Sequence, residues 1–385
     1  MRIVLFCLVA FAIFAAPALC LRFGFPELWR RWLSRVVLGA YGVVLTCTGL
    51  YFYLRLSAPS EARWVVTLAN TIVLAGFGTM LTAIFWGPLI AFYNKRSQQE
   101  PPIDEAKRKL ILNSAKAIPV ASALLSPVGV QAAMNDPIVR PVTIPIDNLP
   151  SGLEGLKILQ LTDVHLGLHI DADQFEKIAK SAQKYNPDLV VLTGDIADDY
   201  SKLGPALEHL KVLAPPLGIY ACIGNHEIYR GRKTAERIYQ EQGIHFLCDN
   251  GTTVERGGAR FWLAGADDPA RLFKNRNSFY NKTIRNALQE KPQDIATSIL
   301  LCHRPKGFDI AAEQGVSLTL SGHTHGAQMA IGGRSIFEPF MPKSYLLGHY
   351  QKDTSHLYTS AGLGHWLPFR LNCPREGALL ELSRA

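Results

Sequence analysis

Side chains that bind divalent metal ions recur in this sequence directly after short apolar segments. The first segment lies within residues 157–165; it is too short for a confident helix and follows Pro150, so its pattern predicts a strand. The strand delivers Asp163 and His165 at its carboxyl end, where active sites gather in open α/β sheets. Four further segments end in the same way. The complete set of candidate metal ligands is Asp163, His165, Asp195, Asn225, His303, His323 and His325.

This mixture of carboxylate, amide and imidazole groups suits a pair of divalent cations such as Mn, Zn, Fe or Mg. Two ions ~3.5–4 Å apart need a bridging ligand, and we expect Asp195 to bridge because each of its carboxylate oxygens can bind one ion. A metal lowers the pKa of bound water from about 15.7 to about 7, so a hydroxide that bridges the ions could attack a phosphoester at neutral pH. A single Asp, Asn or His at a strand end usually forms a turn or a helix cap, but five such ends favour one shared site.

The residues between these ligands predict an α/β domain. Helical spacing over 171–186, followed by the short apolar segment 188–193, predicts a β-α-β unit after the first strand. A hairpin is predicted over 252–264, with Gly257 and Gly258 at its turn. Further strands are expected at 217–223, 298–302, 316–320, 357–361 and 378–382.

Five blocks of this sequence, in order, resemble the calcineurin-like metallophosphoesterases. They are Asp-x-His at 163–165, Gly-Asp-x-x-Asp at 194–198, Gly-Asn-His-Glu at 224–227, His303, and Gly-His-x-His at 322–325. The resemblance covers about 157–383 and implies two packed mixed β-sheets flanked by helices, an αββα arrangement. It also implies that Asp195 joins both ligand sets. Asp163, His165, Asp195 and His325 would hold one ion, and Asp195, Asn225, His303 and His323 the other.

The same resemblance assigns catalytic roles to two residues that are not metal ligands. His226 would donate a proton to the leaving oxygen, and Asp198 would hold that histidine in place. Within the family the sequence is most similar to the membrane-associated YkuE/YaeI-like branch, through residues 321–328 and the Gly-Leu-Gly at 362–364. That branch implies lipid-linked pyrophosphates or phospholipids as substrates. The sequence departs from it at Ala327 and Arg375, positions that concern substrate contacts and leave the metal ligands intact.

Other polar and apolar groups have ordinary structural interpretations. The six remaining histidines are expected to be structural, with His365 as a candidate for the rim of the site. A basic segment over 271–285 is interpreted as a solvated helix face that could bind phosphate. Apolar residues at 337–347 could form a lip for an acyl chain, although packing is the default interpretation. Seven scattered cysteines without a Cys-x-x-Cys pair indicate neither a disulfide framework nor a thiolate zinc site.

The N-terminal region differs in composition and predicts an all-α membrane region over residues 1–135. Residues 3–21, 36–56 and 65–93 are apolar and near or above the ~20 residues that span a bilayer, and 117–134 is a weaker fourth candidate interrupted by prolines. Residues 136–156 are rich in proline and predict an extended linker before the phosphoesterase domain at 157–385. Up to residue 150 there are 14 Lys and Arg against 7 Asp and Glu, while the remainder has 26 against 25. The near-neutral C-terminal domain argues against nucleic acid as a partner.

Basic residues after the first and third apolar segments place those loops in the cytoplasm, so the number of spans decides the side of the active site. Four spans would export the domain and three would keep it cytosolic. Residues 107–109, Lys-Arg-Lys, resemble a twin-arginine export signal that lacks the paired arginines, and this resemblance favours export. The unpaired cysteines favour the cytosol. We expect a multi-pass protein of the cytoplasmic membrane with an extracytoplasmic catalytic domain.

The sequence thus predicts a membrane-anchored dinuclear-metal phosphodiesterase or pyrophosphohydrolase acting on a lipid-linked or nucleotide substrate. A phosphomonoesterase is the alternative enzyme. A membrane sensor or scaffold with a structural metal site is the alternative from another class, although structural sites are normally coordinatively closed.

Overall fold

The computed structural model describes residues 105–167, 169–270, 274–365 and 368–385, together with isolated helical positions at 35, 39, 42, 43, 46 and 71. The predicted spans at 3–21, 36–56 and 65–93 lie outside the described residues, apart from those isolated positions. The chain divides into two units. One comprises Met1–Gln131 with Leu367–Phe369, and the other, here called the catalytic unit, comprises Ala132–Trp366 with Arg370–Ala385.

The long helix α4 (Glu105–Met134) includes the weaker candidate span at 117–134. Pro119 and Pro127 lie inside this helix, although each removes a backbone donor and is usually unfavourable there. Charged residues occupy its first turns, so the apolar part is shorter than the helix. Within the described parts of the chain, we find no helix with the length and apolar character needed to span a bilayer.

The first sheet of the catalytic unit has six strands in the order β1-β14-β2-β3-β4-β5. All neighbours pair in parallel except β14 and β2, which are antiparallel, so the sheet is mixed. The stretch predicted as a linker contains β1, an edge strand, where Pro141 and Pro145 are tolerated because an edge leaves one row of N–H positions unpaired. The strands are β1 (Ile138–Ile146), β2 (Lys157–Leu161), β3 (Leu189–Thr193), β4 (Ile219–Cys222), β5 (His245–Leu247) and β14 (Glu376–Arg384).

The second sheet also has six strands, in the order β12-β13-β9-β8-β7-β6. Its β6–β7 hairpin is the predicted one, with Gly257 and Gly258 at the turn, both with positive φ. A separate two-stranded ribbon pairs β10 with β11. The strands are β6 (Asn250–Arg256), β7 (Ala259–Gly265), β8 (Ser298–Leu301), β9 (Leu318–Ser321), β12 (Gly348–Lys352) and β13 (Ser355–Thr359), with β10 (Ala330–Ile331) and β11 (Arg334–Ser335) in the ribbon.

The two six-stranded sheets share one apolar core between them. Ile158 and Val191 of the first sheet belong to the same buried cluster as Leu263, Ile299 and Leu318 of the second. Side chains alternate between the two faces of a strand, so the next residues along, such as Leu159 and Val190, point to the opposite face and pack under helices. Both faces of these sheets are therefore buried, which explains why the strands are apolar throughout.

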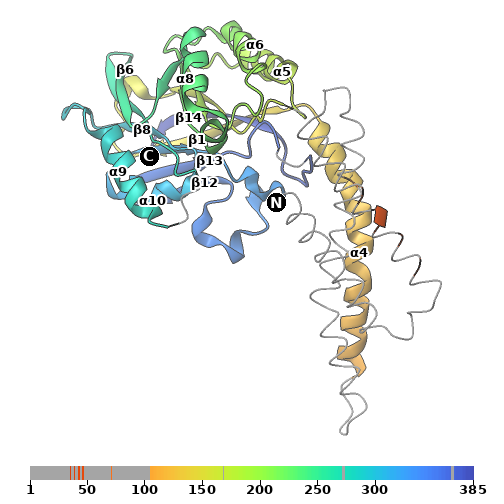
Figure 1. Ribbon diagram of the computed structural model, residues 1–385. Coiled ribbons are helices and arrows are strands. Elements are labelled where there is room, and N and C mark those ends of the chain that lie inside the picture. The colour runs from red at the N-terminus through yellow and green to blue at the C-terminus, as the bar shows by residue number, and fades with distance from the viewer. Residues whose placement is uncertain are drawn as a thin grey trace. The chain divides into compact units, whose positions relative to one another are not determined.

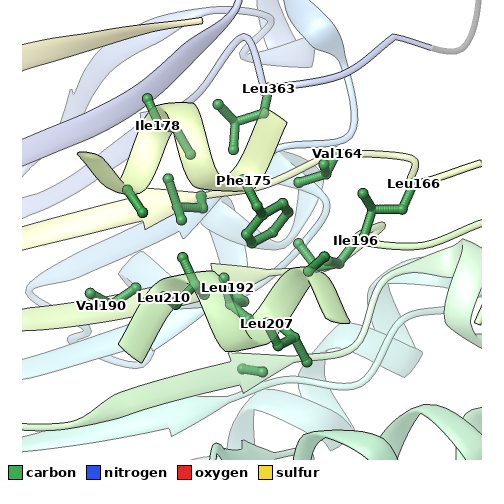
Figure 2. Close-up of a cluster of buried hydrophobic side chains, with 14 of the residues drawn as sticks. Val164, Leu166, Phe175, Ile178, Val190, Leu192, Ile196, Leu207, Leu210 and Leu363 are labelled. Atoms are coloured by element: carbon green, nitrogen blue, oxygen red, sulfur yellow. The ribbon is translucent and has the colours of Figure 1, made fainter. Parts of the chain in front are cut away.

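Helices cover the outer face of each sheet and complete the αββα layers (Figure 1). On the first sheet, Phe175 of α5 lies among side chains from neighbouring strands and helices, at the centre of Figure 2. On the second sheet, Tyr280 and Ile310 pack against Trp262 and Leu300. The helices of the catalytic unit are α5 (Ala172–Gln183), α6 (Leu203–Glu208), α7 (Asn225–Arg230), α8 (Arg232–Glu241), α9 (Arg276–Leu288) and α10 (Phe308–Glu313).

Candidate metal centre

The predicted ligands lie at strand ends from both sheets. Asp163 and His165 follow β2, Asp195 follows β3, and Asn225 is the first residue of α7 just beyond β4. From the second sheet, His303 follows β8, and His323 and His325 follow β9. Because the two sheets face one another, these ends meet in one place.

Three overlapping groups of potential ligand atoms form there, each with its atoms within 4.8 Å of one another. Asp195 and His165 each belong to two of the groups, so the groups form one continuous centre. Nearly all of the side chains are buried. The groups are Asp163 with His165 and His325, His165 with Asp195 and His226, and Asp195 with His303 and His323.

The spacing of the donor atoms fits shared metal ions. Nε2 of His165 lies 3.3 Å from Nε2 of His325, and Nε2 of His325 lies 3.5 Å from Oδ1 of Asp163. Ligand atoms about 2.0–2.2 Å from a common ion are about 3–3.5 Å from each other. The groups therefore have the separation expected of ligands around one cation.

The tautomer of His303 gives a second test of the fit. Its Nδ1 lies 2.8 Å from the carbonyl oxygen of Thr193 and so carries a proton, and a neutral ring would then offer the lone pair of Nε2 to a metal ion. That Nε2 lies 3.1 Å from Oδ2 of Asp195 without a hydrogen bond. Two acceptors at this distance require a cation or a proton between them. Burial lowers the pKa of His303, but the Asp195 carboxylate outweighs it and raises this pKa to about 10.

Burial governs the charges of the other ligands. It raises the pKa of Asp163 despite the nearby histidines, and it holds the pKa of His325 and of His323 well below the usual range. Asp195 is the exception, because His303 and its neighbours overcome burial and hold its pKa well below normal. Asn225 is buried, and its Oδ1 has no hydrogen-bond partner. The donor set therefore fits divalent cations, which would satisfy these atoms.

The backbone is in the left-handed region at five of the seven predicted ligands. Asp163, His165, Asp195, His323 and His325 have φ between 50° and 68°. Asp and His tolerate this region better than most residues, but it still costs free energy. Such strain persists only where surrounding contacts hold it, and it is common at functional sites.

His226 and Asp198 lie beside the ligands as a hydrogen-bonded pair. Nδ1 of His226 is 2.5 Å from Oδ1 of Asp198, while Oδ2 of Asp198 is 3.5 Å from Nδ1 of His165. Burial pushes the pKa of Asp198 upward, but contacts with His165 and His226 outweigh it and lower this pKa. Asp198 thus holds His226 by a hydrogen bond, lies within ion-pair distance of His165 and stays ionised.

The sequence pattern of the calcineurin-like phosphoesterase family matches residues 156–327. The uncharacterized metallophosphoesterase YkuE of Bacillus subtilis is 31% identical over 256 residues, which are 63% of this chain and 84% of YkuE. This chain belongs to the calcineurin-like metallophosphoesterase family. A transmembrane protein with metallophosphoesterase domain from Danio rerio is 30% identical over 69% of this chain, and one from Bos taurus is 29% identical over 89%. The chain spans 62% of the zebrafish protein and 74% of the bovine one.

The Glu227 carboxylate supports the backbone of the loops that carry the candidate ligands, a role that the sequence did not predict. Its Oε2 accepts hydrogen bonds from the backbone N–H of Asp195 at 2.8 Å and of Gly224 at 2.9 Å, and its Oε1 accepts one from Ile196 at 2.8 Å. One buried side chain therefore joins the loops that follow β3 and β4. An acidic residue at the third position of a helix, as here in α7, is a capping signal visible in the sequence.

Arg370 supports the opposite side of the centre. Its buried guanidinium donates to the carbonyl oxygens of Ala361, Gly362 and Gly364. It also donates to the carbonyl oxygens of Cys373 and Pro374. The loop that it holds is hydrogen-bonded to the ligand strand, because Gly364 N–H donates to Asp163 O at 2.8 Å. No sequence signal pointed to this role, because it depends on contacts with carbonyl groups.

The six other histidines lie outside the three ligand groups, as predicted. His365 is buried, with its ring centre 5.6 Å from that of His169, and His349 Nε2 is 2.9 Å from His356 Nδ1. Arg304, which no motif singled out, approaches the centre. It is anchored on Asp268 at 2.8 Å, and its Nη1 lies 3.1 Å from Nε2 of His323.

Close packing against Gly322 generates the first test of this geometry. A Cβ at this position would lie 2.0 Å from Oδ2 of Asp163 and 2.3 Å from Oγ1 of Thr162. Gly322→Ala should therefore displace Asp163 and lower the metal content of the purified protein, measured by mass spectrometry of bound metals. Gly204→Ala is the control, because its Cβ would meet only Nε2 of Gln242 at 3.8 Å. Equal metal content in both variants would show that Asp163 is not a ligand.

Proposed function

We propose that this chain is a membrane-anchored, dinuclear-metal hydrolase of phosphodiester or pyrophosphate bonds. The observation that carries the proposal is that two groups of potential ligands, Asp163 with His165 and His325 and Asp195 with His303 and His323, are joined because His165 and Asp195 also lie together. Asp163, His165 and His325 would hold one ion, and Asn225, His303 and His323 the other. Asp195 would be shared between them. The metal could be Mn, Zn, Fe or Mg.

Divalent ions held there would supply positive charge that offsets the phosphoryl oxygens and would make water acidic enough to act as a nucleophile. The protein's own residues would donate the proton, orient the proton donor and add positive charge. His226 lies close to His165 and Asp195, and its ring is hydrogen-bonded to Asp198, so we assign it to give a proton to the leaving oxygen. Asp198 fixes the ring of His226 through Nδ1, which leaves Nε2 to face the substrate. The Arg304 guanidinium adds a positive charge next to His323, where a phosphoryl oxygen would bind.

The proposed substrate is a phosphoester in a lipid-linked or nucleotide molecule. The apolar segments at 3–21, 36–56 and 65–93 support membrane anchoring, as do the names of the zebrafish and bovine relatives, which describe transmembrane proteins. The proposed location is the cytoplasmic membrane, with the catalytic domain outside the cytoplasm. An exported phospholipid or lipid pyrophosphate is then the substrate class of first choice.

Hydrolysis of simple aryl substrates separates this function from its alternatives. With added Mn²⁺, the full chain should hydrolyse an aryl phosphodiester faster than the matching aryl monoester, and chelation should abolish both activities. The reverse preference would favour a phosphomonoesterase. Absence of hydrolysis in a protein that retains its metal would favour a sensor or scaffold with a structural site.

The shared position of Asp195 gives the second prediction for this site. Asp195→Asn keeps the size of the side chain but removes the charge that both ions would share, so we expect the variant to lose dinuclear metal binding. Metal content per chain is the measurement. Asp199→Asn is the matched control, since Asp199 is an exposed neighbour whose side chain accepts hydrogen bonds from Ser201. Two retained ions with normal turnover would show that Asp195 does not bridge.

The position of His226 gives the third. His226→Ala should leave metal content unchanged and slow turnover about 10²–10⁴-fold, the usual contribution of general acid catalysis. The loss should shrink as the leaving group becomes a better one, because good leaving groups need no proton. His209→Ala, in a histidine outside the centre, should change neither quantity. An equal loss across aryl leaving groups of different pKa would exclude the proton-donor role.

A further inference from the structure

The exposed apolar side chains of the catalytic unit concentrate in one loop. Ile331, Phe337, Phe340 and Met341 are four of the eight large apolar side chains that are exposed among its described residues. Phe340 is 83% exposed and Ile331 73%. Isolated exposed apolar residues are normal on soluble surfaces, but the concentration of four of them within residues 331–341 favours an interaction site. The default interpretation of packing thus holds for the buried Leu346 and Leu347 and fails for this group.

The loop over residues 330–345 leaves from and returns to the segment that carries His323 and His325. Its first residue comes two positions after the short helix His325–Gln328. Thr324 Oγ1 donates to the carbonyl oxygen of Leu346 at 2.6 Å, and Ile336 N–H donates to that of Met329 at 3.1 Å. The base of the 330–345 loop is therefore fixed to the metal centre, while its apolar tip faces outward.

Basic side chains accompany the tip. Lys343 is exposed two residues after Met341. Together with Lys306 and Lys352 it lines a cavity of about 320 Å³, whose acidic residues are Asp309 and Glu313. Asp309 is already occupied, because it accepts hydrogen bonds from Lys352 at 3.1 Å and from the Tyr345 hydroxyl at 2.9 Å.

The charged residues of the 330–345 loop itself carry a net positive charge. Glu338 is its one acidic residue, and it lies 3.5 Å from Arg334. Lys343 therefore has no acidic partner within the loop, and the cavity that it lines holds three lysines against two acidic residues. Exposed aromatic and aliphatic side chains next to lysines form the pattern of segments that lie in the boundary layer of anionic membranes.

We propose that the 330–345 loop inserts its tip into a bilayer that contains anionic phospholipid. Phe340, Met341 and Ile331 enter the acyl boundary, and Lys343 meets headgroup phosphates. This contact is made by the catalytic unit itself and is separate from any N-terminal anchor. Because the loop is fixed to the His323–His325 segment, insertion holds the metal centre at the membrane surface, within reach of phosphoesters in lipid headgroups.

Fluorescence quenching by lipids measures how deep the loop inserts and needs no measurement of hydrolysis. A loop that fails to insert can therefore be distinguished from a failure of the proposed function. A fluorescent amino acid replaces Phe340 in the full chain, which is reconstituted in phosphatidylcholine vesicles with or without phosphatidylglycerol. Nitroxide groups on the lipid acyl chains quench fluorophores that enter the bilayer. The same fluorophore at Val212, an exposed apolar position on the short helix His209–Leu213, is the matched control.

We expect quenching at 340 to exceed that at 212 about threefold, in keeping with a tip buried ~5–10 Å in the bilayer boundary. Quenching at 340 should fall when phosphatidylglycerol is omitted and when Met341→Asp is introduced. Equal quenching at the two positions would overturn the proposal. So would a fluorophore at 340 that is shielded from water but not quenched by lipid, because a protein partner or a second copy would then cover the loop. Quenching that is indifferent to phosphatidylglycerol would overturn the assignment to an anionic surface.

Discussion

Burial of Asp163 and Asp195 within one small space is the constraint that the rest of the catalytic unit satisfies. Removing a carboxylate from water is costly unless positive charge or hydrogen bonds replace the lost hydration. Here the compensation comes from imidazole rings and from backbone N–H groups such as that of His323, and cations bound by the donor set would add to it. Each ligand must therefore approach closely, and the chain accepts left-handed backbone at five of them to achieve this.

Two buried side chains outside the ligand set hold this strained arrangement. Glu227 joins the loops after β3 and β4, and Arg370 holds the 361–364 loop, which is bonded to Asp163. Both bond backbone groups, so they fix the loops that carry the ligands without using the ligand side chains. The two aspartates after β3 also differ in role. Asp198 orients His226, whereas Asp195 lies among the potential ligands.

Much of this architecture could be predicted from the sequence, because buried strands in layered α/β folds are short, apolar and followed by their polar residues. The hairpin with Gly257 and Gly258 and the strand ends that carry the candidate ligands are predictable in this way. The prolines of β1 predict a linker because they hide its alternating pattern, and only its partner β14, more than two hundred residues away, makes it a strand. Arg370 was missed for a similar reason. It binds backbone carbonyl groups, and because every residue has one, the residue types of its partners do not reveal this role.

The parallel pairing of β1 with β14 has a mechanical consequence. The nine residues of β1 lie in register with nine residues at the end of the chain, and Arg140 of β1 forms an ion pair with the buried Glu376 of β14 at 3.1 Å. Tension directed along β1 would load the hydrogen bonds of this ladder together in shear and would not open them one after another. The strand that follows the residues before Ile138 would then resist such pulling through its whole length of contact with β14.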